Sequence, residues 1–199
     1  PETFYALTKL VAEQAVMGFR DRMCVTAVRS ATCFGPAPRM RLDTIVNVFC
    51  KQAYYDHVII VHDGTQWRSN VHVQDAAEFY ALLLMADEEK INGEVFNIAE
   101  HSRTAYHIAH MVERFFNETE YKASVIVDPS KKDHRQYRMS ARKAFQVLSW
   151  VPKRGIVQGV KDNICFFEAG NIKDPEDPLY WNTRRMENLV KGGSSGIRS

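Results

Sequence analysis

Apolar and polar residues follow two periods along this chain, one typical of helices and one typical of buried strands. In residues 2–22 the apolar side chains recur at steps of three and four, which predicts an amphipathic helix. Residues 24–34 form a β-branched, apolar run that Gly35 and Pro36 end, which predicts a buried strand. The same patterns predict helices at 42–54, 75–86, 105–116, 140–148 and 155–168, and strands at 58–61, 70–73, 93–99 and 123–127.

The alternation of strands and helices indicates an α/β fold. A doubly wound sheet usually opens with a strand and a glycine-rich phosphate-binding turn. This sequence contains no G-x-G-x-x-G, and its pattern opens with a helix. We therefore expect a partial Rossmann-type doubly wound parallel sheet with a smaller α/β lobe. From Gly170 the chain is polar and ends in KGGSSGIRS, which predicts a disordered end.

Composition narrows the class of protein. Charged residues make up 25% and apolar residues 45% of the 199 residues, close to the average for folded domains. A net charge of +2 provides no field for nucleic acid, and no apolar run is long enough to span a membrane. The four cysteines form no C-x-x-C pair, which predicts free thiols in the reducing cytoplasm. The seven histidines are scattered, so we expect no metal site.

Tyr5 and Lys9 are the first residues with candidate chemistry. They are four positions apart, so they share one face of the predicted helix. A nearby ammonium favours the phenolate, and in a dry site it could bring the tyrosine pKa from about 10 towards neutrality. The pair would then be a general acid–base. The spacing alone equally fits two solvated neighbours on a surface helix.

Five motifs in order resemble the extended short-chain dehydrogenase/reductase family, which includes nucleotide-sugar epimerases and dehydratases. They are YALTK, VRSATCFGP, DGTQWRSNVHVQDAAEFYALLL, GEVFNIAE and LSWVP, and together they cover roughly residues 1–168. The resemblance implies an NAD or NADP cofactor and a nucleotide-sugar substrate.

The resemblance assigns roles to residues around the opening helix. Tyr5 is implied to be the catalytic acid–base, and Lys9 to hold the nicotinamide ribose and lower the tyrosine pKa. Thr32 and Phe34 are implied to contact the cofactor, and Thr32 and Cys33 the substrate. Many relatives have asparagine at the position of Thr32, which leaves the geometry of the sugar open. Packing within a buried strand is the other interpretation of Thr32 and Cys33.

Arginines are implied to bind the diphosphate of the substrate. Arg68 occupies such a position, and a guanidinium suits phosphate because its forked donors stay charged. Arg135 fits a second position of this kind, although Arg138 and Lys132 compete for it. A solvated loop arginine is the other interpretation of Arg68.

Further polar residues are weaker candidates. Asn47 matches a residue that meets the nucleotide, or it lies on a helix surface. Arg39 and Arg41 are candidates for phosphate or sugar contacts, or are ordinary loop charges. We expect Asp75 to cap a helix and His72 to pack in the core.

The resemblance also suggests a division of the chain. Residues 1–35 and 71–99 would be the remainder of the Rossmann-type domain. Residues 36–70 and 100–168 would be the substrate-binding lobe, followed by a polar tail at 169–199.

The function implied is that of the C-terminal part of an NAD(P)-dependent nucleotide-sugar epimerase/dehydratase. The simplest reaction is 4-epimerisation, an isomerase activity, and a 4,6-dehydratase or a reductase stays open. We expect this chain alone to be inactive, and the full-length enzyme to be a homodimer. The alternative is a non-catalytic remnant or a module for sugar-nucleotide binding or dimerisation.

Overall fold

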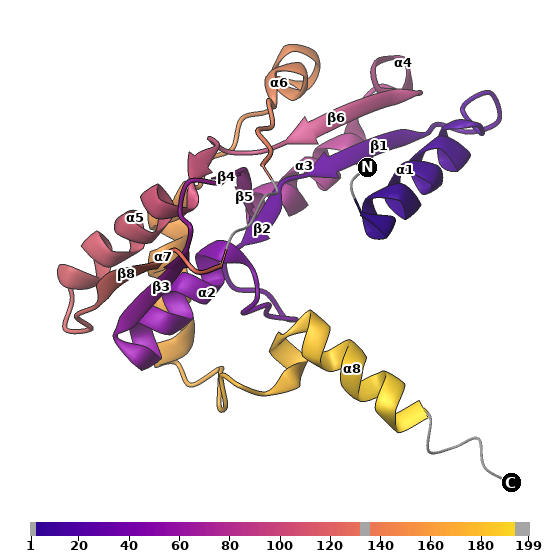
Figure 1. The fold of residues 1–199 in the computed structure, drawn as a ribbon. Coiled ribbons are helices and arrows are strands. Elements are labelled where there is room, and N and C mark those ends of the chain that lie inside the picture. The colour runs from indigo at the N-terminus through magenta and orange to yellow at the C-terminus, as the bar shows by residue number, and fades with distance from the viewer. Residues whose placement is uncertain (1–2, 132–135, 194–199) are drawn as a thin grey trace, which may run out of the picture.

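The structure of the chain is a computed structural model that describes residues 3–131 and 136–193. Strands and helices alternate along it, as predicted (Figure 1). The strands are β1 (Thr26–Ser30), β2 (Thr32–Phe34), β3 (Val58–His62), β4 (Trp67–Arg68), β5 (Asn70–His72), β6 (Glu94–Ile98), β7 (Arg103–Thr104) and β8 (Ser124–Asp128). The helices are α1 (Phe4–Met17), α2 (Ile45–Lys51), α3 (Val73–Met85), α4 (Glu88–Ile91), α5 (Ala105–Asn117), α6 (Arg142–Leu148), α7 (Ile156–Glu168) and α8 (Asn182–Gly193). A π-helical turn η1 (Gln52–Asp56) extends α2, and a 3-10 turn η2 (Pro178–Tyr180) precedes α8.

The strand predicted at 24–34 is divided in two. β1 runs parallel to β6, and β2 runs parallel to β5. The Ala31 N–H donates to the Ile98 carbonyl, whereas the Thr32 N–H donates to the Ser69 carbonyl. The chain therefore changes its pairing partner between two consecutive residues, which a pattern of apolar residues cannot reveal.

Helices cover both faces of the β1–β6 pair. Phe79 of α3 packs edge-on against Phe96 and Trp150, with ring centroids 6.0 and 5.1 Å apart. Arg29 of β1 lies in register with the residue after Phe96, so it points to the opposite face. There it donates two hydrogen bonds to Glu13 of α1. The core on the α3 side is the smaller of two apolar clusters in the described residues, and we call it the sheet cluster.

The larger apolar cluster, which we call the lobe cluster, lies among α2, α5, α7 and the β3–β8 pair. β3 and β8 are parallel, with Ile59 opposite Val125. Ile59, Ile108 and Phe116 are completely buried. Tyr54 of η1 stacks near Phe167 of α7 at a centroid distance of 5.3 Å. This cluster carries the loops that surround the candidate site.

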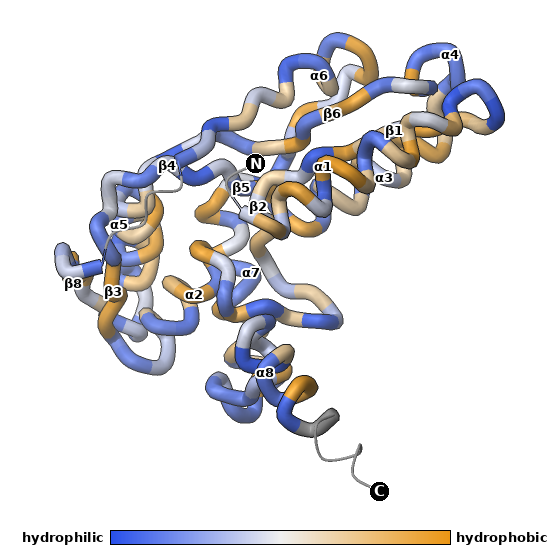
Figure 2. Tube along the Cα trace, turned by 45° about the vertical axis from the view of Figure 1, so that its right-hand side comes forward, coloured by the Kyte–Doolittle hydropathy of each residue, from blue (hydrophilic) through white to orange (hydrophobic). Residues whose placement is uncertain are grey.

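α1 is the least buried of the long helices near the sheet. It has no buried residue, although apolar positions run along it (Figure 2). The exposed apolar side chains of α1 are Phe4, Tyr5, Leu7, Leu10, Val11 and Val16. α1 therefore presents an apolar surface that no described residue covers.

A tight turn at Asp63 and Gly64 follows β3. Asp63 and Gly64 have φ angles of 60° and 89°, so both lie in the left-handed region. Such a pair of positive φ angles defines a tight reversal that favours Asp-Gly.

The residues after 169 contain a helix where we expected a polar tail. The Asp177 carboxylate accepts the Leu179 N–H at 2.8 Å and starts η2, and α8 follows. The apolar residues Met186, Leu189 and Val190 recur at helical spacing, which was the available signal. The expected disordered end beyond 193 lies outside the described residues.

Candidate functional site

Tyr5 and Lys9 lie on the exposed face of α1. Thr3 caps this helix by accepting the Ala6 N–H at 3.1 Å. The Lys9 Nζ lies 5.5 Å from the centre of the Tyr5 ring. The predicted pair is therefore adjacent in space. Tyr5 is 70% exposed, so the described residues leave its hydroxyl open to solvent.

Thr32 and Arg68 meet at Tyr137. The Thr32 Oγ1 lies 3.4 Å from the Tyr137 hydroxyl, within hydrogen-bonding distance. The Arg68 guanidinium lies 5.4 Å from the centre of the Tyr137 ring. Arg68 is only 7% exposed, and its Nη1 donates to the Trp67 carbonyl at 2.8 Å. The structure thus brings together two residues that are far apart in sequence and were assigned to the same ligand.

Tyr137 was not among the residues predicted from the sequence. It lies in the basic stretch SKKDHRQYR, where the only hint was an aromatic residue among cations. Two contacts hold its segment in place. The Arg138 guanidinium stacks 3.5 Å from the centre of the Trp67 ring, and the Met139 N–H donates to the Ser69 Oγ at 2.9 Å. The Ser69 hydroxyl also bonds to that of Ser102 at 2.7 Å.

Arg135, the second predicted phosphate ligand, lies outside the described residues. Its competitor Lys132 also lies outside them. Arg138 is described, and it stacks on Trp67, the residue before Arg68 in β4. The second position for an arginine therefore stays a prediction.

Phe34 is a core residue at the junction of three elements. It is 1% exposed and packs edge-on against His72 with centroids 5.3 Å apart. A Cβ on Gly159 of α7 would overlap the Phe34 ring. A bound cofactor could therefore touch only the backbone of Phe34. The predicted contact between Phe34 and the cofactor stays a prediction, limited to that backbone.

The cysteines are all unpaired. Burial raises the pKa of the Cys33 thiol, and burial raises the pKa of Cys50 to about 12. A raised pKa keeps a thiol protonated and unreactive at neutral pH. Cys33 could therefore contact a substrate as a small neutral group beside Thr32.

Asn47 is buried, and its amide is used within the chain. Its Oδ1 accepts the Gly35 N–H at 3.0 Å and the Asn163 side-chain N–H at 3.0 Å. Its Nδ2 donates to the Arg41 carbonyl at 2.8 Å. Asn47 is 2% exposed, and its hydrogen bonds to Gly35 and Arg41 fix the conformation of the loop between them.

Arg39 and Arg41 both have partners near α2. Arg39 donates to the Asn182 Oδ1 at 2.8 Å, and Arg41 donates twice to Asp43, at 2.9 and 3.1 Å. Both arginines are therefore engaged in the loop that follows β2.

The cap of α3 differs from the prediction. His72 is the N-cap, and its ring Nδ1 accepts the Gln74 N–H at 3.2 Å. Asp75 lies inside the first turn and accepts the backbone N–H groups of Lys153 and Arg154 at 3.0 and 2.9 Å. Asp75 is structural as expected, but it holds the loop before α7 and does not cap α3.

Residues 3–131 and 136–193 contain no group of three or more His, Cys, Asp or Glu side chains placed to share a metal ion. None of the helices in this part of the chain combines the length and the apolar character needed to cross a bilayer.

Several residues of the candidate site lie in a stretch of the chain that matches a known protein family. Residues 1–99 match the NAD dependent epimerase/dehydratase family. The match includes Tyr5, Lys9, Thr32 and Arg68. This match confirms the resemblance drawn from the motifs.

Solved structures with a similar fold include three enzymes. RMD from Pseudomonas aeruginosa, complexed with NADPH, has a TM-score of 0.72 at 18% identity, and the match covers 85% of this chain and 58% of that one. dTDP-glucose 4,6-dehydratase from Bacillus anthracis, in complex with NAD, has a TM-score of 0.69 at 19% identity, and the match covers 92% of this chain and 56% of that one. UDP-glucose 4-epimerase from Thermotoga maritima, with UDP-glucose, has a TM-score of 0.69 at 23% identity, and the match covers 84% of this chain and 54% of that one.

These likenesses confirm the Rossmann-type α/β fold. The chain spans a little over half the length of each of the three matched structures. The division into a sheet domain, a lobe and a tail stays a prediction.

Proposed function

We propose that this chain forms part of an NAD(P)-dependent enzyme that acts on a nucleotide sugar, most simply as a 4-epimerase. The observation that carries the proposal is the meeting of Thr32 and Arg68 at Tyr137. A buried guanidinium beside hydroxyl groups suits a ligand that has a diphosphate and sugar hydroxyls. The UDP-glucose in the similar epimerase structure supports this substrate class.

The position of Thr32 also supports the proposal. Thr32 follows the carboxyl end of β1 by two residues, at the point where the strand changes partner. In open α/β sheets, ligands bind outside the carboxyl ends of the strands, at a change in strand order.

In the proposed reaction Tyr5 exchanges a proton with a hydroxyl group of the sugar. As that proton reaches the Tyr5 oxygen, the hydroxyl becomes a carbonyl, and the hydride of the same carbon leaves the sugar. NAD(P) supplies the hydride acceptor and, on the return step, the donor. Lys9 is close enough to stabilise the phenolate electrostatically. The open face of α1 has room for a cofactor at Tyr5, which the described residues leave 70% exposed.

Two further parts of the proposal concern organisation and setting. The two apolar clusters support a sheet domain and a substrate lobe, with exceptions to the predicted division. Phe34 joins the lobe cluster, and Ala144 and Trp150 join the sheet cluster. The unpaired thiols support a reducing compartment such as the cytoplasm.

Binding of nucleotide sugars tests the proposed function. UDP-glucose and dTDP-glucose would be titrated into the 199-residue chain by calorimetry. We expect Arg68→Ala to weaken binding by roughly tenfold or more, because it removes charge-assisted hydrogen bonds to phosphate. Arg142→Ala, an exposed arginine at the start of α6, is the matched control. Failure of the wild-type chain to bind either compound would disprove the proposed substrate class.

Turnover is a separate question. We expect none from this chain by itself, because it spans only a little over half the length of the NAD- and NADPH-bound structures that it resembles. Incubation with NAD and UDP-glucose, followed by chromatography of the sugar nucleotides, tests this. Turnover would contradict the expected inactivity, and Tyr5→Phe should then abolish it.

We also propose that the apolar face of α1 pairs with a second copy of the chain. Leu7 and Val11 are 44% and 55% exposed and lie four residues apart on this face. Sedimentation velocity should show a dimer for the wild type. Leu7→Glu/Val11→Glu should shift it to monomer, whereas Val157→Glu on α7 should not. A monomeric wild type at about 50 µM would contradict the dimer, since stable interfaces form well below that concentration.

A further inference from the structure

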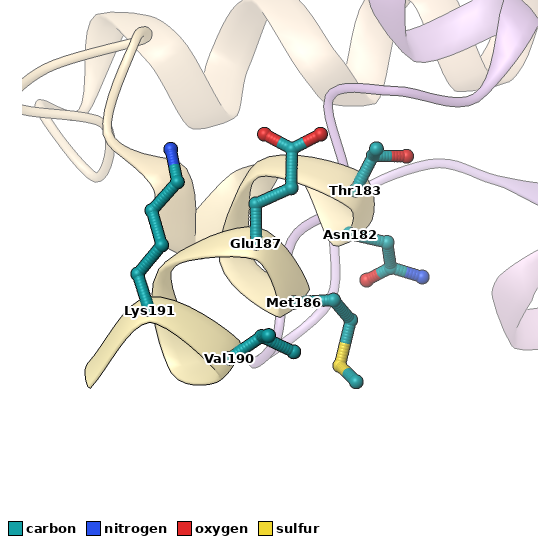
Figure 3. Close-up of a pocket in the computed structure, with 6 residues that line it drawn as sticks. All are labelled: Asn182, Thr183, Met186, Glu187, Val190 and Lys191. Atoms are coloured by element: carbon teal, nitrogen blue, oxygen red, sulfur yellow. The ribbon is translucent and has the colours of Figure 1, made fainter. Parts of the chain in front are cut away.

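The segment after α7 returns to the loop that follows β2. We call residues 171–182 the brace and residues 35–44 the entry loop. Figure 3 shows the start of α8, where Asn182 and Thr183 lie beside the chain of this loop, while Met186 and Val190 point away from it. The brace thus ends against a loop that lies far from it in sequence.

Three hydrogen bonds join the brace to the entry loop. The Leu42 N–H donates to the Tyr180 carbonyl at 3.0 Å. The Asn182 N–H donates to the Asp43 Oδ2 at 3.1 Å, and Arg39 Nη2 donates to the Asn182 Oδ1 at 2.8 Å. Leu42 is completely buried, so this end of the loop is fixed by both its backbone and its side chain.

A second anchor lies in the middle of the brace, at Glu176. The Lys51 Nζ lies 2.7 Å from Glu176 and 3.1 Å from Asp56. Burial lowers the pKa of Lys51, but the hydrogen bonds that Lys51 donates to Glu176 and Asp56 outweigh burial and raise that pKa overall. Lys51 is 7% exposed, and a buried ammonium needs such partners. The brace therefore supplies part of the charge balance of α2.

The entry loop carries this constraint to the candidate site. Asn47 Nδ2 holds the Arg41 carbonyl in the middle of the loop, and Asn47 Oδ1 holds the Gly35 N–H at its beginning. Gly35 has a φ of 95°, and a Cβ there would lie 2.5 Å from the His72 Nε2. Gly35 directly follows β2, which begins at Thr32. A continuous set of contacts thus joins the brace to the strand that carries Thr32.

We propose that the brace is a positioning element of the nucleotide-sugar site, acting through the entry loop and Asn47. This inference rests on the proposed function. A loop that is already ordered loses less conformational entropy when its ligand binds. Loss of the brace contacts should therefore weaken substrate binding without removing any group that touches the substrate.

The test weakens both side-chain anchors of the brace. Glu176→Gln removes one of the two negative charges beside Lys51, and Asn182→Ala removes the acceptor for Arg39. The control, Met186→Ala/Lys191→Ala, removes two side chains from the exposed surface of α8. Asn182→Asp keeps an oxygen acceptor for Arg39 and serves as the conservative rescue.

Two measurements are made on each variant of the 199-residue chain. Amide hydrogen exchange at Gly35 and Leu42 should quicken by about tenfold in the double variant. The Kd for UDP-glucose and for dTDP-glucose should rise by about fivefold to tenfold, as expected for the loss of one or two hydrogen bonds. The control and Asn182→Asp should match the wild type in both.

Each other outcome contradicts the inference. Unchanged affinity in the double variant, with normal binding by the wild type, would overturn it and leave the proposed function intact. If the control and the double variant both lose affinity in proportion to the fall in their thermal unfolding midpoints, the brace contributes only to stability, which also overturns the inference. A wild type that binds neither sugar nucleotide would reject the proposed function, and this inference with it.

Discussion

At the scale of single residues, the chain uses buried polar side chains where two elements meet. Asp75 joins α3 to the loop before α7, and Asn47 joins α2 to the entry loop. Both are at most 2% exposed. Each side chain accepts hydrogen bonds from backbone N–H groups of loop residues, which lie outside the helices. A loop that would otherwise be loosely held is thereby given one conformation.

Asp75→Asn should be clearly destabilising. The Arg154 side chain bonds to Asp75, and the change weakens that ion pair as well as two backbone hydrogen bonds. We expect a loss of about 2–3 kcal/mol in the free energy of unfolding, measured with urea. Glu78→Gln, which alters the more exposed partner of the same arginine, should cost clearly less, because solvent screens an exposed ion pair. Equal effects of the two changes would contradict this assignment.

His72 should make stability fall in mild acid. Burial lowers its pKa below the ordinary value of 6.5, and this outweighs the Asp162 carboxylate 3.2 Å from its Nε2. Asp75 raises and Arg154 lowers the same pKa more weakly. The unfolded chain therefore binds a proton at a higher pH than the folded chain. The His72 contribution is complete above the unfolded pKa, and it is lost progressively as the pH falls from there through the lower folded pKa.

The measurement is the free energy of unfolding from about pH 7.5 to about pH 5, the range in which histidine titrates. His72→Asn keeps an oxygen that can cap α3 but has no titrating ring. Its stability should fall less steeply with pH than that of the wild type. Identical slopes would exclude His72 as the cause.

At the scale of elements, the local signals predicted most of the helices and strands. α3, α5 and α7 lie within two residues of their predicted bounds, because their apolar spacing and caps are properties of adjacent residues. The prediction of one strand over 24–34 was wrong. Its division into β1 and β2 depends on the partners β6 and β5, which lie far away in the sequence. The candidate site shows the same limit. Tyr5 and Lys9 are neighbours by helical spacing alone, whereas Tyr137 reaches Thr32 only through the folded chain.

Close packing of α7 against β2 gives a prediction at this scale. A Cβ at residue 159 would overlap the Phe34 ring, which is buried and cannot move away freely. Gly159→Ala should therefore cost about 1–3 kcal/mol in the free energy of unfolding, although alanine is the better helix former. Val157→Ala, on the exposed side of the same helix, should change it by less than about 0.5 kcal/mol. A stabilised Gly159→Ala variant would show that the helix can shift.

At the scale of the whole molecule, two apolar clusters share one junction. Phe34 belongs to the lobe cluster, and its ring meets His72 on β5. Val71, the residue before His72, belongs to the sheet cluster. Asp75 and Arg154 form a second link between α3 and the start of α7. The sequence indicated two regions, but it gave no sign of these links, because each joins residues from distant parts of the chain.

These links predict that the two clusters unfold together. Trp150 lies in the sheet cluster, and Trp181 packs against the lobe cluster. Variants that keep only one of these two tryptophans, with Trp67 replaced by Phe in both, provide a fluorescent probe for each cluster. Urea transitions followed by the two probes should coincide, after correction for each variant's overall stability by circular dichroism. Separate transitions would show that the junction does not couple the clusters.

The change of strand partner at Ala31 also determines where this chain could be cut for a split-protein reporter. Residues 24–34 read as one strand but contribute to two pairings, so a one-residue insertion would reverse the inward and outward positions in one pairing and leave the other unchanged. A cut at Ala31 would leave β1 on one fragment and β2, β5 and β6 on the other. The fragments would then have to restore the β1–β6 pairing and the continuity between β1 and β2 at the same time. The turn at Asp63–Gly64 connects β3 to β4, which are not partners of each other. Fragments divided at that turn would keep the β1–β2 run whole on one piece and its partner strands, β5 and β6, whole on the other.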